Sequence, residues 1–278
     1  MINLRPITSR KDIYIPVGLL LFIATFSILI PYLSPYSSDI VGAVHFEIGP
    51  QPPSFKHWFG TDIAGRDMFT LTLAAGATSL KVAAGVVFIS MIIGVPLGLI
   101  AGVKGGLPDD IIMRVSDGFL AFPPLILPVA ITAALGPSLN NIIIGIAISW
   151  FPWYVRISRS QAMLISTMDY VLISRCLGGS NFHIIIKHIL PNILSPIIIQ
   201  ASIDAGYAIL VSAGLSFIGL GVQHPQVEWG LLITQSRAQF LNYWWVVLFP
   251  GLFISMTVVS FNLIGDGIRD YTRAVKFN

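Results

Sequence analysis

The sequence is poor in charge and in cysteine. Only 10% of its 278 residues are Asp, Glu, Lys or Arg, whereas a soluble domain carries about 25%. The single cysteine, Cys176, excludes an intramolecular disulfide. A net charge of +3 is too small to indicate nucleic acid as a partner. Because 55% of the residues are hydrophobic and mean hydropathy is +0.81, the chain is predicted to be a membrane protein in contact with lipid.

Motifs for enzymatic chemistry are also missing. The sequence contains neither the G-x-x-x-x-G-K-[ST] phosphate loop nor H-E-x-x-H. Its five histidines do not show metal-ligand spacing, so no metal site is predicted. Residues 214–217 are similar to the G-x-S-G serine motif of rhomboid-type proteases, but Phe217 stands in the fourth position. We therefore expect a protein that is not an enzyme and holds no cofactor itself.

Apolar segments dominate the chain. A helix needs about 20 apolar residues to cross a bilayer. The first candidate follows Arg5, Arg10 and Lys11, as in a signal peptide, but its apolar run exceeds a signal core and lacks a small-x-small cleavage site. We interpret it as an uncleaved anchor. The predicted spans are residues 13–33, 82–103, 118–135, 141–155, 193–217 and 243–264.

The basic residues predict the topology. Six spans with a cytoplasmic N-terminus place twelve of the sixteen Lys and Arg residues on the cytoplasmic side, which obeys the positive-inside rule. Lys56, Arg66, Lys81 and Arg237 are the four outside. The fold class is therefore an all-α membrane protein with six transmembrane helices and both termini in the cytoplasm.

Two patterns concern packing near the second span. Gly94, Gly98 and Gly102 recur every fourth residue, which is typical of a face that packs closely on another helix. Arg114 and Asp117, three residues apart in the following polar turn, are expected to pair on one helix face.

Aromatic and acidic side chains mark two other spans. Trp150, Trp153 and Tyr154 are predicted to form an interfacial aromatic belt. Asp204 lies near the middle of the fifth span, where a carboxylate costs about 2.5–3.5 kcal/mol unless it faces protein or water. One hypothesis places Asp204 and Gln200 on a translocation path. The alternative is a structural hydrogen bond to a neighbouring helix or subunit.

Residues 169–191 mix charge, glycine and apolar side chains. Gly178 and Gly179 are expected to stop a first short helix, and Ser180 or Asn181 to cap a second. Pro191 is expected to end that second helix. Its apolar side is predicted to carry Phe182, Ile185, Ile186 and Ile189. From the residues alone, this segment is either a partner-binding element outside the membrane or a loop on the bilayer surface.

Residues 34–78 are predicted to form an irregular extracytoplasmic segment that is rich in proline and aromatic residues. It contains HWFGTDIAGRDMFT at residues 57–70, in which Asp62, Arg66 and Asp67 can pair around glycine turns. Alternatively, His57 and Asp62 are metal ligands, although a third ligand is missing.

These motifs together resemble ABC importer permeases. HWFGTDIAGRD is similar to the H-x-x-G-T-D-x-x-G-R-D signature of C-type subunits in the dipeptide/oligopeptide/nickel branch. The L-G-x-S and H-I-L-P-N elements resemble the cytoplasmic "EAA" coupling loop, with residues 172–174 reading Leu-Ile-Ser where the family usually has Glu-Ala-Ala. LSFIGLG, EWG and FNLIGDGIRD extend the resemblance over nearly the whole chain.

The resemblance implies a type I ABC importer permease fold and a division of the chain. Residues 1–74 would hold the anchor and external loop, 75–266 the transmembrane domain with coupling loop 160–191, and 267–278 a cytoplasmic tail. The implied ATPase-coupling residues are Arg175, Gly178, Gly179, Ser180, Asn181, Phe182 and Lys187. The implied signature-loop residues, near a docking face for a binding protein, are His57, Gly60, Thr61, Asp62, Gly65, Arg66 and Asp67.

The resemblance also implies the partners and the cargo. The partners would be a second, homologous permease, an extracytoplasmic substrate-binding protein, and two ATPase subunits that carry ATP and Mg²⁺. Localisation would be the cytoplasmic membrane of a prokaryote. The expected substrates are di- or oligopeptides, with nickel, metal chelates, opines or oligosaccharides as alternatives. An ATP-independent secondary transporter is the alternative from another class.

Overall fold

A computed structural model describes residues 11–276 of the protein. Arg5 and Arg10, which precede the first predicted span, lie outside the described residues. In the described part every regular element is helical, and sheet-like pairing is limited to one isolated bridge between Thr61 and Asp67. The predicted all-α fold is confirmed.

The helices form an elongated bundle. In chain order the elements are α1 (Lys11–Leu33), η1 (Ser37–Val41), α2 (Met68–Lys104), α3 (Gly106–Leu120), α4 (Ile126–Leu135), α5 (Leu139–Ser166), α6 (Asp169–Cys176), α7 (Asn181–Ile184), η2 (Ile185–Ile189), α8 (Leu190–Phe217), α9 (Trp229–Ser236) and α10 (Trp245–Lys276). Four segments are long and apolar enough to span a membrane: Ile13–Leu33, Met68–Lys104, Asn181–Phe217 and Trp245–Thr272.

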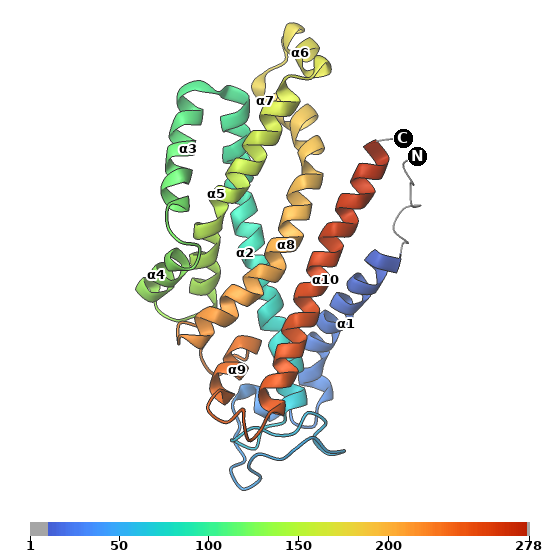
Figure 1. The fold of residues 1–278 in the computed structure, drawn as a ribbon, viewed down its shortest axis with the longest axis vertical. Helices are drawn as coiled ribbons and strands as arrows, with labels where there is room; N and C mark the ends of the chain where they lie inside the picture. Colours follow the sequence, from blue (N-terminus) through green and yellow to red (C-terminus); the bar gives the residue numbers. More distant parts are fainter. Residues whose placement is uncertain (1–10, 277–278) are drawn as a thin grey trace.

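The two ends of the bundle are built differently. Figure 1 shows α6 and α7 at one end, with the end of α10 nearer to them than the start of α1, which lies about midway along the bundle. The irregular segment between α1 and α2 lies at the opposite end, beside α9. α2 packs against α1, α5 and α8, so it is the central helix that connects the two halves of the core.

Two predicted boundaries are wrong. The segment 118–135 is not a continuous helix: α3 ends at Leu120 and α4 begins at Ile126. Pro123 and Pro124 lie in the gap, and neither has the backbone N–H that a helix needs. The external segment 34–78 is irregular only as far as residue 67, because Asp67 caps α2 by accepting a 2.8 Å hydrogen bond from the Thr70 amide. The expected division of the chain after residue 74 falls inside α2, and the one after residue 266 falls inside α10, which continues to Lys276.

The glycine repeat on α2 seats α5, as predicted. A Cβ added at Gly94 or Gly98 would overlap the backbone of α5, and one at Gly102 would come within 2.7 Å of the Arg159 carbonyl oxygen. α5 is longer than the predicted span 141–155, since it covers residues 139–166.

The predicted aromatic belt is only partly correct. Trp150 and Tyr154 are buried by packing inside the bundle, while Trp153 is half exposed. Trp150 stacks on Tyr207 of α8 with ring centroids 5.3 Å apart. The close approach of α2 and α5 turns this side of α5 inward, which hydropathy alone does not reveal.

Ion pairs join α3 to α5. The predicted Arg114–Asp117 pair does not occur among the described residues. Asp117 Oδ1 instead accepts a 2.7 Å hydrogen bond from Arg156 Nη2 of α5. One turn further along α5, the two oxygens of Asp109 accept hydrogen bonds from Nε and Nη2 of Arg159. Because the guanidinium groups of α5 reach across to α3, a tertiary contact replaces the local one.

Candidate functional sites

The segment around residues 169–191 begins as the sequence predicts. α6 ends at Cys176, and Gly178 follows with φ of +88°, a left-handed conformation that glycine adopts without strain. Ser180 then caps α7, since its Oγ accepts a 3.2 Å hydrogen bond from the His183 amide. The helix stop and the second helix start are both confirmed.

The apolar side of this second helix divides into two faces. Ile184 and Ile189 are fully buried among α2, α5 and α8 residues, so Ile189 does not share one side with Phe182 and Ile186 as predicted. Phe182 and Ile186 are exposed to 76% and 48%. An open hollow at this end is lined by Phe182, His183, Ile186, Lys187 and Pro191.

Pro191 does not end the helix, contrary to the prediction. The helical segment continues from Asn181 to Phe217, 37 residues that include α7, η2 and α8. The stretch Ile185–Ile189, directly before the proline, is π-helical. We attribute this wider turn to the proline, because a ring that clashes with the carbonyl four residues back is accommodated when the turn gains a residue. The segment is thus helically continuous with α8.

The remaining predicted coupling residues lie on the surface of the same end. Arg175, in the last turn of α6, is exposed, as are Asn181 and Lys187. Gly179 is tightly placed: its amide donates to the Ser174 carbonyl oxygen at 2.9 Å, and a Cβ would come within 2.7 Å of that oxygen. Every member of the predicted set except Gly179, which is half-buried, is therefore exposed.

At the opposite end, Asp62 and Arg66 form the centre of the loop between α1 and α2. Both side chains are buried, and Arg66 Nη2 lies 2.7 Å from Asp62 Oδ2. Asp62 Oδ1 accepts hydrogen bonds from the amides of Ala64 and Arg66, both at 2.9 Å. The predicted Asp62–Arg66 pairing is confirmed. The Asp62 carboxylate therefore holds both the backbone of the turn and the Arg66 guanidinium.

Asp67 belongs to a second, separate polar group. It pairs with His57 Nδ1 at 2.9 Å rather than with Arg66. Its backbone amide donates to Asp39 at 2.7 Å, and Asp39 in turn lies 3.0 Å from His45. Burial, followed by the charges of Asp67 and Asp39, raises the pKa of Tyr36, so this phenol stays protonated against the His57 ring. Sequence reasoning missed Asp39 and His45 because nothing local marks them.

The geometry disfavours the metal alternative for His57 and Asp62. Their side chains have different partners, Asp67 and Arg66, in a part of the chain where no group of three potential ligands occurs among described residues. The remaining signature residues shape the backbone. Thr61 Oγ1 donates to the Gly49 carbonyl oxygen at 2.7 Å, and Gly60 and Gly65 both have φ of +73°. A Cβ at Gly65 would overlap the carbonyl of His45.

Asp204 occupies the middle of α8 with a partner on its own helix. Gln200 Nε2 donates to Asp204 Oδ1 at 2.9 Å, so the two predicted path residues are brought together. The buried Tyr154 side chain of α5 lies beside the same carboxylate. Asp204 is therefore supplied with polar neighbours on the protein side instead of facing lipid alone.

α9 connects the external loop with α8, and the sequence pointed to it only through the EWG motif. Glu228 is fully buried at its start and accepts hydrogen bonds from the Leu231 amide and the Ser216 hydroxyl, at 3.0 and 2.9 Å. Trp229 is likewise buried, and its indole N–H donates to the Thr72 carbonyl oxygen of α2 at 2.8 Å.

Comparison with known proteins agrees with these features. Residues 94–273 match the family model of binding-protein-dependent transport system inner membrane components. The chain belongs to this family. It is a transporter subunit and a multi-pass membrane protein, and not an enzyme.

Curated relatives match almost the full length of this family member. It is 44% identical over 270 residues to the probable D,D-dipeptide transport system permease protein DdpC of Escherichia coli (strain K12). This match covers 97% of this chain and 88% of the relative. It is 43% identical to the dipeptide transport system permease protein DppC of Alkalihalophilus pseudofirmus, over 94% of this chain and 86% of the relative.

Solved structures identify the fold of this family member. A structure of the MetNI methionine ABC transporter in an inward-facing conformation superposes with a TM-score of 0.59 at 19% identity. The match covers 72% of this chain and 94% of the MetNI chain. The fold is that of a type I ABC importer permease.

Proposed function

We propose that the chain is one permease of an ATP-driven, binding-protein-dependent importer of di- or oligopeptides. The observation that carries this proposal is near-full-length similarity, at 43–44% identity, to permeases named for D,D-dipeptide and dipeptide transport. Other relatives named for peptides and glutathione favour the same cargo over nickel or metal chelates.

The proposed topology has six passes with both termini in the cytoplasm of a prokaryote. Along the bundle axis the chain alternates in direction through α1, α2, the α3–α4 pair, α5, α8 and α10 (Figure 1). α3 and α4 are each short, but together they run along the bundle in the direction opposite to α5. The end that carries α6 and α7 is the cytoplasmic one, because the positive-inside rule assigns it twelve of sixteen basic residues.

On this topology each end meets a different partner. The exposed surface around Phe182, Ile186 and Lys187 fits a groove of an ATPase subunit, two copies of which would carry ATP and Mg²⁺. The loop organised by Asp62 and Arg66 is the docking face for an extracytoplasmic binding protein. A homologous second permease completes the path, on which Asp204 and Gln200 lie. ATP binding then biases an equilibrium between inward- and outward-facing states.

Replacement of Phe182 tests the coupling surface. Phe182→Glu places a charge on the exposed apolar face, so uptake should fall at least tenfold while membrane insertion and assembly stay normal. Phe182→Leu keeps the face apolar and should retain most uptake. Full uptake by the Phe182→Glu variant would show that this surface does not transmit ATPase motion.

A further inference from the structure

α9 is tied to the external loop through a single amide side chain. Arg66 Nη2 donates to Gln235 Oε1 across 3.3 Å, although the two residues are 169 positions apart. On its other side, Gln235 Nε2 lies 2.6 Å from His224 Nε2. Gln235 therefore joins the Asp62–Arg66 turn to the last turn of α9 and to the connection between α8 and α9.

The hydrogen-bond donors determine the direction of the hydrogen bonds that run from Arg66 through Gln235 to His224. A guanidinium has only donors, so Arg66 requires the oxygen of the Gln235 amide. The amide nitrogen of Gln235 then faces His224, whose Nε2 must accept. Since the Arg66 guanidinium is already held by Asp62 Oδ2 and its backbone amide by Asp62 Oδ1, this series of hydrogen bonds has one self-consistent arrangement.

At its other end α9 is fastened to α8. Glu228, the N-cap of α9, accepts hydrogen bonds from Ser216 Oγ at 2.9 Å and from Ser212 Oγ at 3.5 Å. Gly230, in the first turn of α9, packs so closely on Ala213 that an added Cβ would overlap its Cα. Glu228 is fully buried with four hydrogen-bond donors around it, so α9 and the end of α8 are packed as one unit.

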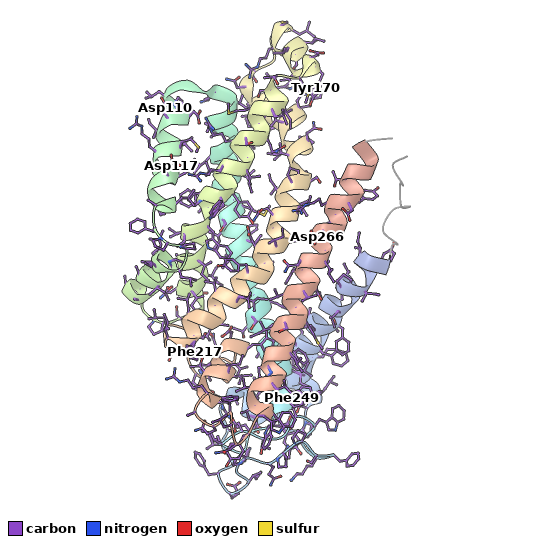
Figure 2. The ribbon with its side chains drawn as sticks, in the orientation of Figure 1. Asp110, Asp117, Tyr170, Phe217, Phe249 and Asp266 are labelled. Carbon is purple, nitrogen blue, oxygen red and sulfur yellow. The ribbon has the colours of Figure 1, made fainter. Side chains whose placement is uncertain are left out.

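α8 carries this connection to the opposite end. The helix that ends at Phe217 begins at Asn181, so it is about 55 Å long at 1.5 Å per residue. Figure 2 shows Phe217 at the α9 end and Tyr170 of α6 at the far end. The external loop, α9, α8 and the exposed surface around Phe182 are thus linked through direct contacts and one continuous helical segment.

We propose that α9 is the element by which binding-protein docking acts on the rest of the permease, with Gln235 as its positioning residue. Gln235 would touch neither substrate nor binding protein. It converts a shift of the Asp62–Arg66 turn into a shift of α8, and hence of the coupling surface. This inference rests on the proposed function, which places the binding protein at the signature loop.

The test is stimulation of ATP hydrolysis in the complete complex, reconstituted in vesicles. Gln235→Leu preserves size but removes both hydrogen bonds, so the stimulation by substrate-loaded binding protein should fall at least fivefold. Basal hydrolysis and the Kd of the binding protein should change less than twofold. Gln235→Asn shortens the side chain by one methylene and should lose stimulation similarly. Gln235→Glu keeps the acceptor for Arg66 and should retain it.

Matched variants separate α9 from the signature loop itself. Gln226→Leu, at an exposed position on the same connection, should leave stimulation unchanged. In a double-mutant cycle, Gln235→Leu should add little to the loss already caused by Arg66→Ala. If Arg66→Ala abolishes stimulation but Gln235→Leu does not, the role of α9 is refuted while docking at the loop stands. If neither variant alters stimulation, the docking assignment fails as well.

Discussion

Gln200 and Asp204 are one turn apart on α8, and the amide nitrogen of Gln200 donates to the Asp204 carboxylate at 2.9 Å. This local bond gives the carboxylate a partner without joining α8 to another helix. The same carboxylate lies beside the buried Tyr154 side chain of α5. A charge on the proposed path and a structural contact with α5 predict different effects of substituting Asp204.

Asp204→Asn should lower uptake of cationic and zwitterionic peptides about tenfold, because it removes the charge and keeps the size. Asp204→Leu should lower it at least as much. Both complexes should assemble normally, as judged by co-purification of the partner subunits. Near-normal uptake by the Asn variant, combined with loss of assembly in the Leu variant, would instead establish a structural hydrogen bond.

Gly94→Ala should destabilise the subunit by about 1–3 kcal/mol, because the new methyl group would overlap the Phe151 carbonyl of α5. Gly118→Ala provides the control, since nothing lies within 4 Å of its added Cβ on α3. The apparent Tm of the purified complex should fall for Gly94→Ala only. An equal fall in Tm for both variants would contradict a specific role of the α2–α5 contact, because helix propensity alone favours alanine over glycine.

The two ion pairs between α3 and α5 should differ in strength. Arg159→Ala breaks a two-pronged pair whose side chains are 29% and 14% exposed, so we expect a loss of about 1–3 kcal/mol. Arg156→Ala breaks a pair that is 43% and 54% exposed, and should cost less than about 1 kcal/mol. The measurement is the apparent Tm of each variant in low salt. A larger loss for Arg156→Ala would contradict the geometry.

Ser180→Ala should weaken the start of α7 by about 1 kcal/mol, because the His183 amide loses its acceptor. Ser180→Asp keeps an acceptor at this helix start and should be close to wild type. The readout is hydrogen exchange of the residue 181–184 amides, which should become faster in the Ala variant alone. Unchanged exchange in Ser180→Ala would show that packing of Ile184 holds this turn without the cap.

Much of this molecule could be predicted from local patterns. The Gly178 stop, the Ser180 cap and the Asp62–Arg66 pair depend on residues within four positions of each other, and all three are confirmed. The close packing of the α2 glycine repeat could also be predicted from its four-residue period alone. The residues that form these features lie close together in the sequence, so a single sequence is sufficient to predict them.

The errors share a physical cause, which is that tertiary contacts override local signals. Pro191 reads as a helix end, yet a π-helical turn before it lets the helix continue. Asp117 has a possible partner three residues away but pairs with Arg156 of another helix. Gln235 could not be recognised because its partner Arg66 lies 169 positions away in the chain.

The central claim is ATP-driven peptide import with a binding protein. The most direct measurement is uptake of a labelled dipeptide into vesicles that contain this chain with its second permease and ATPase subunits. We predict uptake only when ATP is present on the ATPase side and the binding protein on the opposite side, with no dependence on an ion gradient. Uptake that persists without ATP and follows an imposed ion gradient would contradict the account and support a secondary transporter.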